Sequence, residues 1–121
     1  MAEEKPLYWM GRSLKDLSAF PEDVKDVMGY ALYLAQVGEK SIAAKPLKGF
    51  GGAGMLEVVD DHGGDTFRAV YTIRFGDAVY VLHAFHKKSK HGIGTPMAEI
   101  ETIRSRLKLA EAHHRAHGEK G

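Results

Sequence analysis

The chain has 121 residues, the size of one ordinary domain, and its 44% hydrophobic and 27% charged residues exclude a disordered chain. The absence of cysteine excludes disulfides and thiolate sites. No apolar run approaches the roughly 20 residues of a membrane span, and the start resembles no signal peptide, so we expect a soluble cytoplasmic protein. The net charge of +1 hides an uneven distribution, since eight basic and four acidic residues follow Leu82. This distribution suits a basic surface that meets a polyanion, although a solvated helix would give the same pattern.

The first half of the chain predicts one strand and two helices. The apolar run 7–10 suits a buried strand, and Ser13 suits the N-cap of a short helix over 14–20. Pro21 and two acidic residues begin an amphipathic helix that Gly38 ends. Residues 39–54 contain four glycines and predict a flexible connection. They fit no phosphate-binding loop.

The second half predicts an antiparallel meander followed by a helix. The strands are expected at 55–60, 66–75 and 78–86, with turns at 61–64 and at Gly76-Asp77. Thr95 and Pro96 suit the N-cap and first residue of a final helix, whose buried stripe is Ile100, Ile103, Leu107 and Ala110. The expected fold is a single α+β domain over 1–121 with a three- to four-stranded sheet and frayed last residues.

A two-residue turn at Gly76-Asp77 would fix the register of the last hairpin, because every cross-strand pair would then have residue numbers that sum to 153. The face predicted to pack on the helices carries the pairs Phe67–His86, Ala69–Ala84, Tyr71–Leu82 and Ile73–Tyr80. The other face carries Arg68–Phe85, Val70–His83, Thr72–Val81 and Arg74–Val79. Lys87 continues this second face, and the preceding hairpin places Glu57 opposite Arg68.

Arg68, Lys87, Glu57 and His83 together supply what cleavage of a phosphodiester by a 2′-hydroxyl requires. Arginine and lysine stabilise charge on phosphate oxygens, while a carboxylate or an imidazole moves protons. A solvated sheet face with one surface ion pair is the structural alternative. The histidine spacing fits no metal site, no serine lies in a nucleophile turn, and Tyr30, Tyr33 and Trp9 suit a core or an interface.

Several segments resemble one known family. They are the Lys45-Pro-Leu-Lys-Gly stretch, Gly54-Met-Leu-Glu, Thr66-Phe-Arg-Ala-Val-Tyr, the strand ending in His86-Lys-Lys-Ser, and Thr95-Pro-Met-Ala-Glu-Ile. In their order and spacing they resemble the phage-derived, HigB-like branch of the RelE/ParE toxin superfamily. The likeness covers nearly the whole chain.

The resemblance implies a type II toxin that cleaves messenger RNA on the ribosome, and a helix-turn-helix antitoxin of the HigA kind as its partner. From the chemistry of Arg68, Lys87, Glu57 and His83 we expect the reaction to need no metal and no cofactor. The resemblance carries the family's strand arginine onto Arg68, the strand glutamate onto Glu57, and the basic pair onto Lys87 and Lys88. Lys48 would be a further RNA contact, and we expect Arg74, Lys88 and Lys90 to hold the RNA backbone as well. The predicted register, rather than the resemblance, favours His83 over His86 for the active face. A gyrase poison that cleaves no RNA and a nucleic-acid-binding accessory protein remain alternatives.

Overall fold

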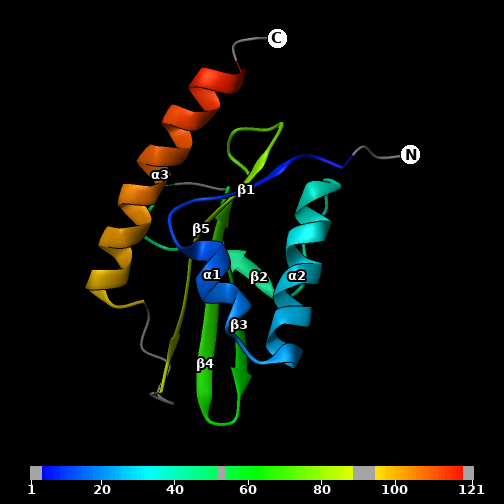
Figure 1. The fold of residues 1–121 in the computed structure, drawn as a ribbon, viewed down its shortest axis with the longest axis vertical. Coiled ribbons are helices and arrows are strands. Elements are labelled where there is room, and N and C mark those ends of the chain that lie inside the picture. Colours follow the sequence, from blue (N-terminus) through cyan, green and yellow to red (C-terminus); the bar gives the residue numbers. More distant parts are fainter. Residues whose placement is uncertain (1–3, 52–53, 89–94, 119–121) are drawn as a thin grey trace.

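The computed structural model describes residues 4–51, 54–88 and 95–118 and contains one five-stranded sheet between two helical layers (Figure 1). The strand order is β1 (Leu7–Trp9), β5 (Val79–Lys87), β4 (Asp65–Thr72), β3 (Met55–His62) and β2 (Ala44–Pro46). Strand β1 is parallel to β5, and the other neighbours are antiparallel. The α+β prediction is therefore confirmed, with a wider sheet than expected. Helices α1 (Ser13–Ser18) and α2 (Glu22–Gln36) pack on one face of the sheet, and α3 (Met97–Gly118) packs on the other.

Helix α2 (Glu22–Gln36) follows its sequence signals closely. Pro21 occupies the N-cap position, and Glu22 and Asp23 lie in the first turn, where the helix dipole favours negative charge. Gly38 has a φ of 85°, the left-handed conformation that commonly ends a helix. The apolar stripe faces the sheet, whereas Tyr30 and Tyr33 on the other side of the helix are 61% and 47% exposed rather than in the core.

The expected N-cap at Ser13 is wrong. Ser13 is the first residue of α1 (Ser13–Ser18), and Arg12 occupies the cap position without a side-chain cap bond. The Ser13 hydroxyl instead donates a hydrogen bond of 3.2 Å to the Val81 carbonyl of β5. A buried hydroxyl needs a partner, and here the partner is the sheet rather than the helix end.

The glycine-rich connection contains a strand that periodicity does not reveal. Strand β2 (Ala44–Pro46) pairs with β3 so that Ala44 lies opposite Val58 and Lys45 opposite Glu57. Three residues are too few for an alternating pattern, and Pro46 argues against a strand in sequence. Proline is tolerated here because β2 is the edge of the sheet.

The central hairpin shifts the predicted pairing of Glu57. Strands β3 (Met55–His62) and β4 (Asp65–Thr72) are joined by Gly63 and Gly64, which both have positive φ, as a tight two-residue turn requires. Glu57 consequently lies opposite Val70, and Arg68 lies opposite Val59. The predicted Glu57–Arg68 cross-strand pair is wrong in register, although both residues remain on one face.

The β4–β5 register is correct only as far as a β-bulge. β5 (Val79–Lys87) keeps the predicted pairs from Phe67–His86 to Val70–His83, but Tyr71 then lies opposite Val81 and Thr72 opposite Tyr80. The predicted pairs Tyr71–Leu82, Thr72–Val81, Ile73–Tyr80 and Arg74–Val79 are therefore wrong. One inserted residue turns the following side chains to the other face, and β4 ends at Thr72, before the expected Gly76-Asp77 hairpin.

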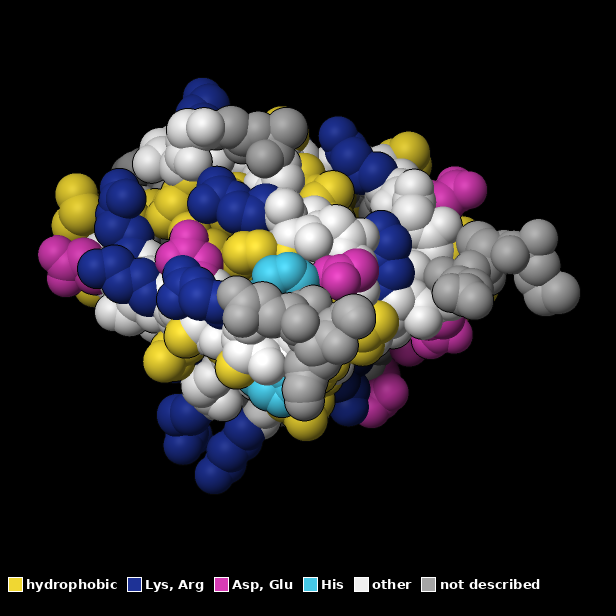
Figure 2. All heavy atoms as spheres, turned by 90° about the horizontal axis from the view of Figure 1, so that it is seen from above, with side chains coloured by type: hydrophobic (Ala, Val, Ile, Leu, Met, Phe, Trp, Pro, Cys, Tyr) yellow, Lys and Arg dark blue, Asp and Glu magenta, His cyan; other side chains and the backbone are white. Residues whose placement is uncertain are grey.

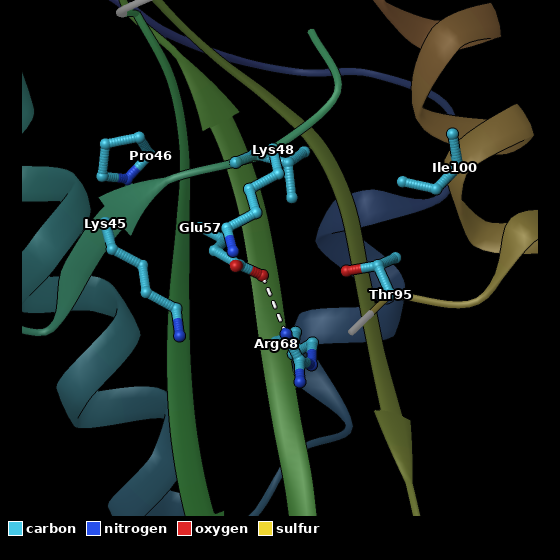
Figure 3. Close-up of a pocket in the computed structure, with 8 residues that line it drawn as sticks. Lys45, Pro46, Lys48, Glu57, Arg68, Thr95 and Ile100 are labelled. Carbon is cyan, nitrogen blue, oxygen red and sulfur yellow. Dashed lines mark hydrogen bonds and ion pairs between the residues drawn. The ribbon is translucent and has the colours of Figure 1, made fainter. Parts of the chain in front are cut away.

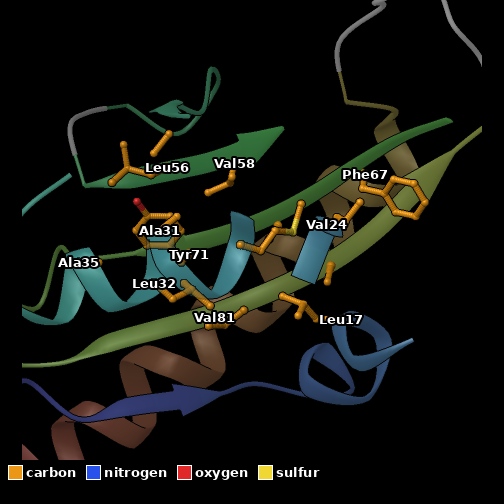
Figure 4. Packing of buried hydrophobic residues seen from close by; sticks show 14 of the residues in the cluster. Leu17, Val24, Ala31, Leu32, Ala35, Leu56, Val58, Phe67, Tyr71 and Val81 are labelled. Carbon is orange, nitrogen blue, oxygen red and sulfur yellow. The ribbon is translucent and has the colours of Figure 1, made fainter. Parts of the chain in front are cut away.

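The bulge divides the apolar residues between two cores. Val79 and Val81 join the cluster under α1 and α2, which also holds Tyr71, Phe67 and Met28 (Figure 4). Tyr80 and Leu82 belong to the cluster under α3. Both faces of the sheet are therefore covered by helix over part of their area, and the predicted solvated face is only partly open.

Helix α3 (Met97–Gly118) buries the predicted residues Ile103, Leu107 and Ala110, while Ile100 is half-buried. Thr95 and Pro96 precede the helix, which begins one residue after the predicted first residue, Pro96. Of the segment 116–121 expected to fray, residues 116–118 belong to the helix, and residues 119–121 lie outside the described residues. No helix among the described residues is both long enough and apolar enough to cross a membrane.

Candidate functional site

A hollow of about 390 Å³ lies on the α3 side of the sheet, between β2 and the start of α3 (Figure 3). We call it the basic hollow, and its lining residues are Lys45, Pro46, Leu47, Lys48, Glu57, Arg68, Thr95 and Ile100. It brings together three of the residues that sequence patterns single out, Lys48, Glu57 and Arg68. These come from three different segments of the chain.

Glu57 and Arg68 form a nearly buried ion pair at the floor of the basic hollow. Arg68 Nη1 donates to Glu57 Oε1 over 2.9 Å, and each side chain is 9% exposed. Their strands pair so that the two residues are diagonal neighbours on one face, which long side chains can bridge. The expected contact therefore exists despite the shifted register.

The Arg68 guanidinium keeps an unused donor. Its Nε is buried and has no hydrogen-bond partner among the described residues. A buried N–H without a partner is costly, and a ligand with acceptor oxygens would remove that cost. Because arginine presents a planar fork of donors, the site suits a phosphate oxygen.

The basic hollow carries more positive than negative charge. Lys45, Lys48 and Arg68 contribute three cations against the carboxylate of Glu57. Both lysines are exposed, and Figure 3 shows their side chains extending from the β2 segment beside the ion pair. In the view of Figure 2, Lys and Arg side chains lie mostly on one half of the face, among acidic and hydrophobic ones. The positive charge is therefore local, as an anion site requires.

The other predicted cationic residues lie outside this hollow. Lys87, half-buried near the end of β5, pairs with Thr66 in the ladder, and Lys88 is exposed immediately after it. Arg74 is exposed, and its Nη2 donates to the Phe50 carbonyl over 3.3 Å. Lys90 lies outside the described residues. Lys87 lies two residues beyond Phe85, the partner of Arg68, and therefore continues the face of Arg68 along β5.

His83 is buried on the expected face, but both of its ring nitrogens are engaged. Nε2 lies 2.5 Å from Glu99 Oε1, and Nδ1 lies 3.2 Å from Arg106 Nη1. His83 lines a second hollow of about 540 Å³, together with Glu99, Phe85 and other residues of α1 and β5. Neither nitrogen is free to accept a proton from a ligand in this arrangement.

Sequence patterns miss several residues that shape the site. Lys45 escapes notice because β2 has no periodicity, although its spacing from Lys48 is a usable signal. Glu99 and Arg106 are polar residues near the buried stripe of α3, next to Ile103 and Leu107. A charged residue beside such a stripe indicates a buried partner. No group of three or more His, Asp or Glu side chains within the described parts of the chain is arranged to hold a metal.

Comparisons with known proteins identify relatives of this chain. Residues 15–108 match the family described as phage-derived Gp49-like protein. No curated protein sequence matches the chain. A mutant of the Escherichia coli toxin RelE in the free state has a similar structure, with a TM-score of 0.56 and 18% identity over 90% of this chain and 98% of that one.

A second solved structure is the toxin–antitoxin complex RelBE2 from Mycobacterium tuberculosis. Its match has a TM-score of 0.46 and 18% identity, and covers 72% of this chain and 95% of that one. The likeness to RelE shows the fold, and the expected RelE-like architecture is thereby confirmed.

Proposed function

The chain belongs to the family of phage-derived Gp49-like proteins, and we propose that it is the toxin of a type II toxin–antitoxin system and cleaves messenger RNA on the ribosome. The observation that carries this proposal is the buried Arg68 guanidinium, which has an unused Nε donor at the floor of a cationic hollow. Its RelE-like fold supports the same conclusion. The proposed partner that neutralises the toxin is a helix-turn-helix antitoxin.

The proposed reaction is attack of a ribose 2′-oxygen on the adjacent phosphorus. The 2′-hydroxyl loses its proton, the bond from phosphorus to the 5′-oxygen breaks, and that oxygen leaves as a hydroxyl after gaining a proton. The products are a 2′,3′-cyclic phosphate and a 5′-hydroxyl. Arg68 would stabilise negative charge on the phosphate oxygens, with Lys87 as a second cation.

Glu57 is the proposed acceptor of the 2′-hydroxyl proton. It shares the basic hollow with Arg68, whereas both nitrogens of His83 are occupied. Lys48, Lys88, Lys90 and Arg74 are proposed to hold the RNA backbone, without reading its sequence. Lys45 joins them because it lines the same hollow.

Arg68→Lys tests the proposal with little disturbance of the fold. Lysine keeps a positive charge beside Glu57 but lacks the planar fork, so we expect RNA cleavage and growth arrest to fall about 10²-fold or more. The measurement is cleavage of a message on translating ribosomes, with analysis of the 3′ and 5′ ends of the products. Lys15→Arg on the exposed face of α1 is the matched control.

Full cleavage by Arg68→Lys would remove Arg68 from the reaction. Products that carry a 3′-hydroxyl and a 5′-phosphate, the ends left by attack of water, would contradict the proposed chemistry. Growth arrest with intact messages and a DNA-damage response would instead select the gyrase poison.

A further inference from the structure

Three polar side chains join α3 to β5 beside the basic hollow. Glu99 in the first turn of α3 contacts His83 Nε2 at 2.5 Å, and Arg106, two turns later, contacts His83 Nδ1 at 3.2 Å. His83 is 9% exposed and Glu99 is 31% exposed. The imidazole is therefore held from both ends by one helix.

The chemistry of arginine fixes which ring nitrogen carries the proton. A guanidinium has only donors, so the contact with Arg106 requires His83 Nδ1 to be an acceptor without a proton. The remaining proton of a neutral imidazole then lies on Nε2, where it is donated to the Glu99 carboxylate. Both contacts are satisfied only by the neutral Nε2–H tautomer.

Arg106 also holds the irregular part of β5. Its Nη1 donates to the carbonyl of Leu82 over 3.1 Å, and Leu82 is the residue that the β-bulge inserts. Gly11 makes room for the guanidinium, because a Cβ atom there would lie 2.6 Å from Arg106 Nε. One side chain thus connects α3, the bulge and the turn before α1.

We propose that Arg106 is a positioning residue, which fixes His83 as a neutral donor to Glu99 and so sets the first turn of α3 beside the basic hollow. Thr95 and Ile100, which flank Glu99, form the α3 wall of that hollow. In the reaction, which rests on the proposed function, His83 then holds this wall and takes no proton from RNA. Arg106 acts through His83 and touches no reacting atom.

The tautomer of His83 can be measured directly by ¹⁵N NMR of the imidazole ring in the full chain at pH 7.5. We expect the Nε2–H tautomer in the wild type and in Arg106→Lys, which keeps a donor. We expect Arg106→Gln to lose the pure Nε2–H form, because the glutamine amide offers an acceptor oxygen as well as a donor, so that Nδ1 can also carry a proton. Arg104→Gln, two residues away and directed at the Gly49 carbonyl, is the matched control and should resemble the wild type.

An Nδ1–H tautomer or an imidazolium in the wild type at that pH would overturn the proposal, even if every arginine variant failed to fold. So would an unchanged tautomer in folded Arg106→Gln. These outcomes do not depend on RNA cleavage, so they stand even if the proposed nuclease activity fails.

His83→Gln separates positioning from proton transfer in the cleavage reaction. The glutamine amide can still donate to Glu99, so we expect cleavage within about tenfold of the wild type, since loss of a general base costs about 10²- to 10⁴-fold. His83→Ala loses the donor and should raise KM more than it lowers kcat. A fall of more than 10²-fold in kcat for folded His83→Gln would restore His83 as the base and contradict the proposal.

Discussion

At the scale of single residues, the fold buries polar side-chain atoms to which no described neighbour is hydrogen-bonded. The Tyr71 hydroxyl is buried among apolar side chains of the α2-facing core, and no described residue provides it with a hydrogen bond (Figure 4). The ring contributes apolar area while its oxygen has lost water without compensation. Tyr71 therefore offers a direct test of the packing.

We expect Tyr71→Phe to stabilise the protein by about 1 kcal/mol, because the substitution removes a buried polar atom and keeps the ring. The measurement is the free energy of unfolding in urea at pH 7. Tyr30→Phe on the exposed side of α2 is the control and should change little. A loss of stability in Tyr71→Phe would indicate a hidden partner for the hydroxyl.

The same residue predicts how stability depends on alkaline pH. Burial raises the pKa of Tyr71 from 10.0 to about 12. As the pH rises, the Tyr71 hydroxyl therefore loses its proton in the unfolded chain before it does so in the folded one. Its contribution to the free energy of unfolding is intact below pH 10 and is lost as the pH rises toward 12. Unfolding midpoints between pH 9 and pH 11 should fall more steeply for the wild type than for Tyr71→Phe.

At the scale of elements, two glycines test how much the contacts of Arg106 contribute to the packing of α3 on the sheet. Gly11 has a φ of 57° and lies against the Arg106 guanidinium, whereas Gly38 has a φ of 85° and open space around it. Alanine at Gly38 should cost about 1 to 2 kcal/mol, the penalty for a left-handed backbone. Gly11→Ala should cost more, since it also displaces Arg106 from Leu82 and His83. Thermal unfolding of both variants tests this difference, and equal losses would contradict it.

The far end of α3 adds a second attachment to the sheet. Tyr80 Oη and His113 Nδ1 lie 2.8 Å apart, and the His113 ring stacks on that of His117 with centroids 4.0 Å apart. The Tyr8 ring also packs against His113, with centroids 4.4 Å apart. Burial lowers the pKa of His113, with smaller effects from His117 and then from His114. The imidazole is thus favoured in its neutral form.

Acidification should therefore weaken this attachment. The unfolded chain binds the proton near pH 6.5 and the folded chain only at lower pH, so stability falls as the pH drops below 6.5. Urea unfolding at pH 7.5 and pH 5.5 should show a smaller difference for His113→Gln than for the wild type. His62→Gln in the β3–β4 hairpin is the control, and an identical pH dependence in all three would refute the assignment.

Sequence patterns predict the helices and strands of this fold better than the register in which the strands pair. Helix α2 and the meander follow from capping, periodicity and turn residues, because these signals are local. The bulge at Leu82 has no such signal, since its geometry depends on Arg106 from a helix formed later in the chain. The β3–β4 pairing differs from the prediction by two residues, and a shift of two leaves every side chain on its predicted face, so Glu57 and Arg68 still share one. The β4–β5 pairing differs by one residue beyond Val70, and a shift of one moves the following side chains to the opposite face.

At the scale of the whole molecule, local positive charge should appear in the salt dependence of RNA binding. Affinity for a single strand falls with salt by a logarithmic slope of about −0.7 for each phosphate contact. We expect Lys48→Gln to reduce the slope by about 0.7, with little change for Lys15→Gln on α1. Titrations of a non-cleavable 2′-O-methyl RNA from 50 to 200 mM salt give these slopes, and an unchanged slope for Lys48→Gln would remove it from the interface.

The parallel pairing of β1 with β5 joins Leu7 to Val79 across most of the chain. During synthesis β1 therefore cannot pair until β5 has been made, and Thr95 and Ile100, which line the basic hollow, are made later still. Domains fold as units once their long-range contacts are available. A nascent chain of this protein consequently has no finished hollow until residues 95–100 have left the ribosome that makes it.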